Sequence, residues 1–237
     1  MSASINFQSI LAGAKVAPEV FKLRADYRAL LLLVEGIPDG DSDATSEAML
    51  QEAETTAKGK LAERPVTELP HVAAWREAYK SFGAKPNKTR NSLEALTRRV
   101  EAGLPRVNRL TDIYNAISVK HQIPLGGEDL VKYSGSPRLI RALGTETFIT
   151  SSGQEHADAG EVVWVDDEGV TCRRWNWRQG PRTALSDKSR NVLFILDALE
   201  PLTDDALTVA ADELSTVLKS LSPGVSESRR LITASSG

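Results

Sequence analysis

The stretch Leu104–Leu130, LPRVNRLTDIYNAISVKHQIPLGGEDL, decides which fold this chain can adopt. Its apolar residues recur every three to four positions, which predicts an amphipathic helix from about Val107 to His121. The Pro-Leu-Gly-Gly sequence at 124–127 then predicts a turn that ends the helical segment. We therefore expect a largely buried helix followed by a sharp change of chain direction.

Three polar side chains lie on one face of this predicted helix. Asn108, Asp112 and Asn115 stand at positions i, i+4 and i+7, and residues at that spacing share a face. A buried carboxylate between two amides is costly unless each group finds a partner. The face either supports the shape of a pocket, for example by holding the segment that ends at Asp129, or contacts a ligand directly. The periodicity does not choose between the two.

The rest of the chain divides into a helical first half and a strand-rich second half. Tyr27–Val34, YRALLLLV, is a nearly continuous apolar run that suits a strand covered on both faces. Helices are predicted at 45–63, 70–82, 93–102 and 203–221, and strands at 5–10, 139–143, 147–150, 161–166, 169–177, 191–196 and 229–234, with a polar loop at 151–160. This segregation favours an α+β fold with mixed or antiparallel sheets. We expect one domain over 1–237, with its core at about 15–220.

The composition argues against several classes of site. The 237 residues include a single cysteine, Cys172, and three histidines that are far apart, so we expect neither an internal disulfide nor a metal site. The glycine-rich motifs of nucleotide-binding folds are absent, and no cofactor is expected. No signal peptide and no apolar run of membrane-spanning length is recognisable, which favours a cytoplasmic protein with no membrane partner. The sequence leaves the oligomeric state open.

Positive charge is concentrated in two segments although the net charge is −3. Nine lysines and arginines lie between Arg76 and Arg109, and six lie between Arg173 and Arg190. If the fold brings the two segments together, they form one surface for an anionic ligand. The alternative, that they are solvated helix and loop faces, is equally open.

The run RRWNWRQ at Arg173–Gln179 has the most unusual composition in the chain. If this run is a strand, its side chains alternate between two faces. One face would carry Arg173, Trp175 and Trp177, and the other Arg174, Asn176 and Arg178. Two guanidinium groups beside an amide suit a phosphate or carboxylate ligand, and the indole rings suit stacking against a nucleobase. The alternative is a pair of core tryptophans covered by arginine side chains.

The segment Val107–Gly135 resembles the B3/B4 domain of the phenylalanine–tRNA synthetase beta subunit. That domain carries an Asn, an Asp and an Asn in one helix, then a Pro-Leu pair, an Asp and a final Gly. The corresponding residues here are Asn108, Asp112, Asn115, Pro124, Leu125, Asp129 and Gly135. The N-terminal half is similar to freestanding relatives of the domain at Trp75, Ser81, Phe82, Gly83, Pro86, Arg90, Ser92, Leu96, Arg98 and Arg99. The resemblance covers roughly residues 15–220.

In the synthetase, the B3/B4 domain is the editing module, which hydrolyses tyrosine wrongly esterified to the phenylalanine tRNA. The resemblance therefore implies a freestanding protein whose partner is tRNA or aminoacyl-tRNA, and which hydrolyses mischarged aminoacyl-tRNA in trans. The implied chemistry is attack of water on the ester bond, which requires groups that orient the water and donors that hold the carbonyl oxygen. It requires neither a metal nor a covalent nucleophile. The domain alone implies no ligase activity.

The sequence departs from the synthetase at two places in the implied pocket. Gly126 stands where the synthetase has a histidine, and the run Thr171–Gln179 replaces a glycine-rich loop with a nearby acidic residue. The identity of the amino acid therefore does not carry over. A non-catalytic RNA binder and a small-molecule-binding module on the same fold remain as alternatives.

The predicted site combines the resemblance with the charge pattern. The residues expected to contact a ligand are Asn108, Gly126, Arg173, Arg174 and Asn176. Those expected to support the pocket are Asp112, Asn115 and Asp129, and those expected to bind RNA are Lys85, Lys88, Arg90, Arg98 and Arg99. No residue is assigned to catalysis.

Overall fold

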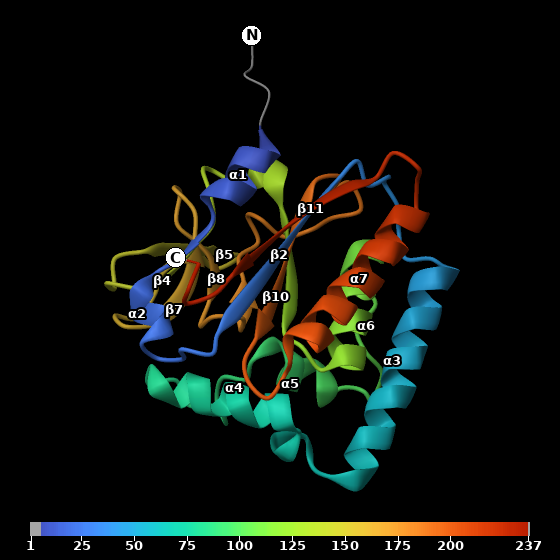
Figure 1. Ribbon diagram of the computed structural model, residues 1–237, viewed down its shortest axis with the longest axis horizontal. Helices are drawn as coiled ribbons and strands as arrows, with labels where there is room; N and C mark the ends of the chain where they lie inside the picture. Colours follow the sequence, from blue (N-terminus) through green and yellow to red (C-terminus); the bar gives the residue numbers. More distant parts are fainter. Residues whose placement is uncertain (1–5, 237) are drawn as a thin grey trace.

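The computed structural model describes residues 6–236, which form two β-sheets that share a core (Figure 1). The four-stranded sheet is antiparallel and has the order β11 (Ser226–Ile232), β2 (Arg28–Glu35), β10 (Val192–Ala198), β3 (Leu125–Asp129). The five-stranded sheet has the order β1 (Lys15–Val16), β4 (Arg138–Arg141), β7 (Val162–Val165), β8 (Val170–Arg173), β9 (Arg178–Gln179). In the second sheet only the β1–β4 pair is parallel. A separate hairpin joins β5 (Thr147–Thr150) and β6 (Gly153–His156).

Helices cover the outer face of the four-stranded sheet. α6 (Arg109–His121) and α7 (Asp204–Ser220) lie against β2 and β10, and α3 (Ala44–Glu63) packs outside α6 (Figure 1). The remaining helices are α1 (Phe7–Gly13), α2 (Pro18–Phe21), α4 (Pro70–Ser81), α5 (Ser92–Thr97) and the 3-10 turns η1 (Val66–Glu68) and η2 (Leu130–Lys132). The predicted α+β fold with mixed and antiparallel sheets is confirmed.

The central strand β2 is buried on both faces, as its apolar run predicts. Leu31 and Leu33 point into the core shared with the five-stranded sheet, whereas Leu30 and Leu32 pack against α6 and α7. The alternation follows from the two-residue period of a strand, which sends successive side chains to opposite faces. Every other residue of β2 and β10 therefore faces the space between the two sheets, where the candidate site lies.

The start of the chain differs from its prediction. The strand expected at 5–10 is wrong for the described residues, because Phe7–Gly13 is a helix; Ile5 lies outside the described residues. The side chain of Asn6 accepts a hydrogen bond from the backbone N–H of Ser9, and this cap starts the helix. The polar loop expected at 151–160 also contains a strand, β6.

The segment after α6 is a strand and not the predicted turn. The helix ends at Gln122, which adopts a left-handed conformation with φ of 57°, and β3 then pairs with β10. Gly126 and Gly127 are therefore paired sheet residues opposite Ile195 and Phe194. The change of chain direction occurs before the glycines, at the helix C-cap.

The strand predicted at 169–177 is also wrong beyond Arg173. Arg174 and Trp175 adopt positive φ angles of 47° and 66°, a region that residues other than glycine rarely occupy. The chain turns there, so the predicted alternation of two faces does not exist. The turn buries the Trp175 ring in the core against Tyr27 and leaves the Arg174 side chain half-buried nearer the surface.

Among the described residues, no helix combines the length and the apolar character that crossing a bilayer requires.

Candidate functional site

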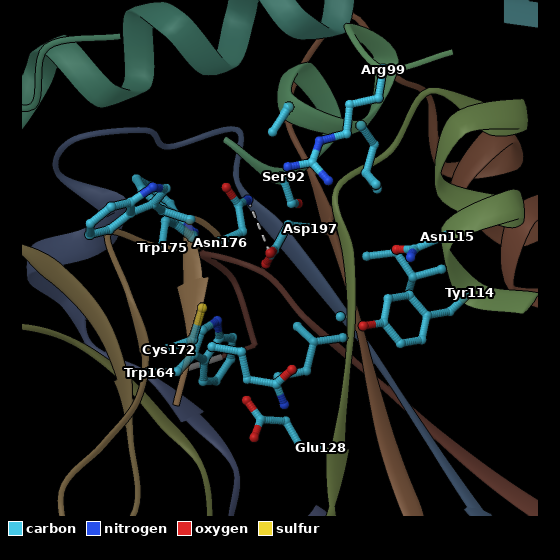
Figure 2. Close-up of a pocket in the computed structure, with 17 residues that line it drawn as sticks. Ser92, Arg99, Tyr114, Asn115, Glu128, Trp164, Cys172, Trp175, Asn176 and Asp197 are labelled. Atoms are coloured by element: carbon cyan, nitrogen blue, oxygen red, sulfur yellow. Dashed lines mark hydrogen bonds between the residues drawn. The ribbon is translucent and has the colours of Figure 1, made fainter. Parts of the chain in front are cut away.

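A cavity of about 260 Å³ lies between the two sheets and is bordered by α5 and α6 (Figure 2). The four-stranded sheet contributes Gly126, Glu128, Ile195 and Asp197 to its wall. The five-stranded sheet contributes Trp164, Cys172 and Gln179, and the turn after it contributes Trp175, Asn176 and Trp177. Ser92 and Arg99 come from α5 and the residues just after it, and Tyr114 and Asn115 come from α6.

Gly126 keeps the middle of the cavity open. A Cβ atom placed on Gly126 meets no atom within 4 Å, so a larger side chain there would project into empty space. Gly127, on the opposite face of the strand, is required by packing, because its Cβ would lie 2.8 Å from Cδ1 of Leu185. The first glycine therefore shapes the cavity and the second allows the strand to pack.

Two buried carboxyl groups flank Gly126 along the sheet. Glu128 is paired with Leu193 of β10, which lies four residues before Asp197, and all these side chains alternate onto the same face. Four residues of strand correspond to about 13 Å. The cavity therefore has an acidic group at each end of one sheet face, and both are almost fully buried.

Asp197 belongs to a buried hydrogen-bond network. Its Oδ1 accepts a hydrogen bond of 2.6 Å from the hydroxyl of Tyr27, and its Oδ2 accepts one of 3.2 Å from Nδ2 of Asn176. The hydroxyl of Tyr79 donates to Oδ1 of Asn176 at 2.9 Å, which fixes the orientation of that amide. Burial raises the pKa of Asp197 to about 7, so this carboxyl exchanges a proton near neutral pH.

The hydrogen bonding of Glu128 differs from that of Asp197. No described residue donates a hydrogen bond to its buried Oε2 atom. Burial raises the pKa of Glu128 to about 8, although the neighbouring Thr183 and Gln179 side chains act to lower it. Because a buried polar atom normally has a partner, this oxygen is available to accept a hydrogen bond from a group bound in the cavity.

Ser92 lies at the end of the cavity nearest Arg99, next to Asn176 and Asp197 (Figure 2). Its backbone N–H donates to the carbonyl oxygen of Asn176 at 3.1 Å, which joins the start of α5 to the turn. Its buried hydroxyl has no hydrogen-bond partner within residues 6–236. One end of the cavity thus holds the free hydroxyl of Ser92, the carboxyl group of Asp197, which titrates near neutral pH, and Arg99. Glu128 lies at the other end (Figure 2).

A basic groove of about 380 Å³ opens beside the cavity. Its wall consists of Lys88, Arg90, Ala95, Arg98, Arg99 and Trp177. Ala95, Arg99 and Trp177 line both the groove and the cavity, so the two spaces adjoin each other. The predicted RNA-binding residues Lys88, Arg90, Arg98 and Arg99 are therefore gathered at one mouth of the cavity.

The cations of this groove are only partly neutralised. The buried Glu94 carboxylate lies within salt-bridge distance of three guanidinium groups, those of Arg76, Arg90 and Arg98. Neither Lys88 nor Arg99 forms a salt bridge with any residue of the described chain 6–236. The groove therefore keeps an excess of positive charge.

Lys85 and Arg174 line a second cavity, of about 410 Å³, on the other side of Lys88. The Arg174 guanidinium lies over the Trp177 ring, with Cζ 4.5 Å from the ring centre, and donates a hydrogen bond to the Thr89 hydroxyl. Lys88 lines both this cavity and the basic groove, so the predicted basic residues form one connected surface.

The three polar residues of α6 have different environments. Asn108 is the N-cap, and its Oδ1 accepts a hydrogen bond of 2.9 Å from the Thr111 backbone; it does not line the cavity. Asp112 accepts hydrogen bonds from the Val107 backbone and the Ser42 hydroxyl, which anchors the loop before α3. Only Asn115 reaches the cavity wall.

Asp129 and Arg173 are both engaged by neighbouring residues. Asp129 caps η2 and accepts a hydrogen bond of 2.8 Å from the Ser189 hydroxyl. Arg173 is buried and donates two hydrogen bonds of 2.6 Å to the two carboxyl oxygens of Glu161. It does not line the cavity, whereas Asn176, from the same run, does.

Sequence reasoning missed the two carboxyl groups and Ser92. Asp197 interrupts the apolar run VLFILDAL, and Glu128 follows the two glycines of GGED. A lone acid within a strand that is buried on both faces is costly, and this is a signal of a functional or networked group. The predicted strand at 191–196 stops one residue short of Asp197.

No group of three or more His, Cys, Asp or Glu side chains with the geometry of a metal site occurs in the described part of the chain.

The family model for the B3/4 domain matches residues 74–222. The chain belongs to the B3/4 domain family. Every residue that lines the cavity falls within this matched segment. The family agrees with the resemblance of the sequence to the B3/B4 domain.

Among solved structures, the B3/4 protein is similar to an N-terminal fragment of the phenylalanyl-tRNA synthetase beta-subunit from Pyrococcus horikoshii. The sequence identity is 14% and the TM-score 0.47, over 90% of this chain. The chain covers 49% of the length of that solved chain. No curated protein matches the sequence.

Proposed function

We propose that this B3/4 protein binds the 3′ end of an aminoacylated tRNA and hydrolyses the ester bond in trans. The observation that carries this proposal is that the basic groove adjoins the cavity, with Arg99 and Trp177 in the walls of both. An aminoacyl-tRNA end requires both features, a cationic surface for the phosphates and an enclosed space for the aminoacyl group.

The groove suits single-stranded RNA. The unpaired Lys88 and Arg99 offer positive charge to backbone phosphates, and the half-buried Trp177 ring offers a surface on which a base can stack. Because Arg99 and Trp177 also line the cavity, a strand bound in the groove would deliver its terminal ribose to the cavity mouth.

The groups at the mouth suit ester hydrolysis by water. In its deprotonated form Asp197 is a candidate general base that takes a proton from water, and its pKa of about 7 is suited to that role near neutral pH. The water oxygen then bonds to the ester carbonyl carbon, and the free Ser92 hydroxyl is a candidate donor to the carbonyl oxygen. The carbon–oxygen bond to the ribose breaks, and the proton passes from Asp197 to the departing ribose oxygen.

A deacylation assay tests the proposal. Tyrosyl, lysyl, seryl and other aminoacyl esters on their non-cognate tRNAs would be incubated with the protein, and release of free amino acid would be followed. We expect hydrolysis above the spontaneous rate for at least one ester. We expect Asp197→Asn to lower the rate by roughly 10²-fold or more, and Ser92→Ala to lower it by roughly 10²-fold.

Matched controls separate chemistry from folding. Asp205→Asn on α7 and Ser9→Ala on α1 change the same residue types at exposed positions and should leave the rate unchanged. Salt-dependent RNA binding without hydrolysis of any ester would favour the non-catalytic RNA binder. Absence of both RNA binding and hydrolysis would leave a small-molecule-binding module.

A further inference from the structure

Glu128 takes no part in the proposed hydrolysis, although it faces the same cavity. Figure 2 places it at the end opposite Arg99 and Ser92, beyond Asp197. An aminoacyl group whose ester lies at Ser92 and Asp197 would therefore extend its side chain toward Glu128. The chemistry around Glu128 indicates which side chain fits.

No cation within the described chain neutralises Glu128. The arginine whose charge lowers the pKa of Glu128 is Arg182. It donates hydrogen bonds of 2.7 and 2.8 Å to the two oxygens of Asp166, so its charge is already paired with that carboxylate. The other titratable groups whose charges interact with Glu128 are the side chains of Tyr114, Tyr133, Cys172 and Asp166. Burial raises the pKa of Tyr114 to about 12 and raises the pKa values of Tyr133 and Cys172, so these three remain uncharged.

The walls near Glu128 are aromatic and apolar. Trp164 from the five-stranded sheet and Tyr114 from α6 flank it, and Ile195 lies on the sheet between Glu128 and Asp197 (Figure 2). Such walls accommodate a methylene chain, and aromatic faces attract a cation. The inner end of the cavity thus offers aromatic and aliphatic surface beside Gln179. The Glu128 Oε2 atom and the Trp164 indole N–H there have no hydrogen-bond partner among the described residues.

We propose that Glu128 selects the substrate by accepting a hydrogen bond from an ammonium group at the far end of the acyl side chain, so that the preferred class is an aminoacyl ester with a basic aliphatic side chain. The proposal rests on the proposed function for the identity of the ester. An ammonium group supplies the donor that Oε2 lacks and the positive charge that offsets burial of the carboxylate. A methyl group in the same place leaves the carboxyl oxygen buried without a partner, which is the more costly arrangement.

Binding of two small amides tests the proposal without RNA. Lysinamide and norleucinamide have side chains of similar length and differ in the terminal ammonium, and neither is an ester. Calorimetric titration of the full chain should give at least tenfold tighter binding of lysinamide. We expect Glu128→Gln to remove this preference and the exposed control Glu63→Gln at the end of α3 to retain it.

The pH dependence gives an independent readout. The ammonium group of lysinamide binds favourably only to an ionised Glu128. In the wild-type chain the affinity for lysinamide relative to that for norleucinamide should therefore rise as the pH increases from 6 to 8.5. The ratio should stay constant in Glu128→Gln. Equal binding of the two amides, a preference that survives Glu128→Gln, or no binding of either amide would overturn the proposal.

The outcomes separate this inference from the proposed function. If the deacylation panel shows hydrolysis but the amides bind equally, only the inference about Glu128 fails. If lysinamide is preferred through Glu128 but no aminoacyl-tRNA is bound or hydrolysed, only the proposed function fails.

Discussion

The two basic segments of the chain have similar compositions, yet the fold uses their charges in different ways. In the second segment, Arg173 pairs with the buried Glu161 and Arg182 with the buried Asp166. In the first segment, Arg76, Arg90 and Arg98 share the single buried carboxylate of Glu94, whereas Lys88 and Arg99 form no salt bridge within the described chain and line one groove. A cluster of cations therefore indicates a binding surface only if the fold leaves the charges without internal partners.

We expect the largest effect, on the free energy of unfolding, from removing a buried ion pair in the second segment. Arg173→Ala leaves the Glu161 carboxylate buried without its bidentate partner, which should lower the free energy of unfolding by about 3 to 5 kcal/mol. Chemical denaturation measures the change. Arg178→Ala, at an exposed position in the same segment, should cost less than about 1 kcal/mol. Similar losses in the two variants would show that the Arg173–Glu161 pair stabilises the fold no more than an exposed pair does.

Because Arg182 is committed to Asp166, Glu128 has no cation of its own among the described residues, and this predicts a pH effect. The folded-state pKa of Glu128, about 8, lies above its ordinary value of 4.5, so its contribution to stability is present at low pH and is lost as the pH rises through this window. Glu128→Gln should therefore stabilise the protein relative to wild type by an amount that grows between pH 5 and 8, on the order of a few kcal/mol. Thermal and chemical unfolding at several pH values measure the difference. A constant difference across this range would contradict the predicted shift.

Lys88 and Arg99, which form no salt bridge within the described chain, predict a smaller effect. We expect their removal to change the RNA affinity and not the free energy of unfolding. The double variant Lys88→Ala/Arg99→Ala should weaken RNA affinity by roughly tenfold, or about 1.4 kcal/mol. It should reduce the slope of log affinity against log salt by about 1.4, or about 0.7 for each lost phosphate contact.

The matched control for this binding prediction lies in the second segment. Lys188→Ala/Arg190→Ala removes two exposed cations outside the groove and should change neither affinity nor slope. If both double variants weaken binding equally, the groove is not the RNA-binding surface, and the contrast between the two segments does not hold.

The smallest effect concerns a residue that sequence reasoning assigned to the ligand. Asn108→Ala removes the N-cap of α6 and should cost about 1 kcal/mol of unfolding free energy. Because Asn108 does not line the cavity, the affinity for lysinamide should stay unchanged. Calorimetry on the variant checks this, and a loss of affinity without a loss of stability would return Asn108 to the binding site.

Local sequence signals predicted much of the fold because their physical causes are local. The apolar run at Tyr27–Val34 predicted a strand buried on both faces, and Thr203 predicted the start of α7, which it caps. The predicted strands at 161–166 and 169–177 leave only two residues between them, and the structure joins β7 to β8 there. In each case neighbouring residues specify the geometry.

The site was predicted less well because its members come from distant segments. Periodicity placed Asn108, Asp112 and Asn115 on one face, but only Asn115 reaches the cavity, because the other two are engaged by residues near the helix start. The predicted strand at 169–177 failed at Arg174, because burial of Trp175 in the core outweighs the cost of two positive φ angles.

The sequence by itself determined the α+β fold class and the concentration of cations in two segments, since hydrophobic periodicity and charge are properties of neighbouring residues. Only the tertiary structure decided which polar groups are free. Glu161 accepts hydrogen bonds from Arg173, which is twelve positions away, and Asp197 accepts one from Tyr27, near the other end of the chain. The Oε2 atom of Glu128 has no hydrogen-bond donor among the described residues. The partner of a buried charge depends on which strands lie side by side, and that arrangement is a property of the whole chain.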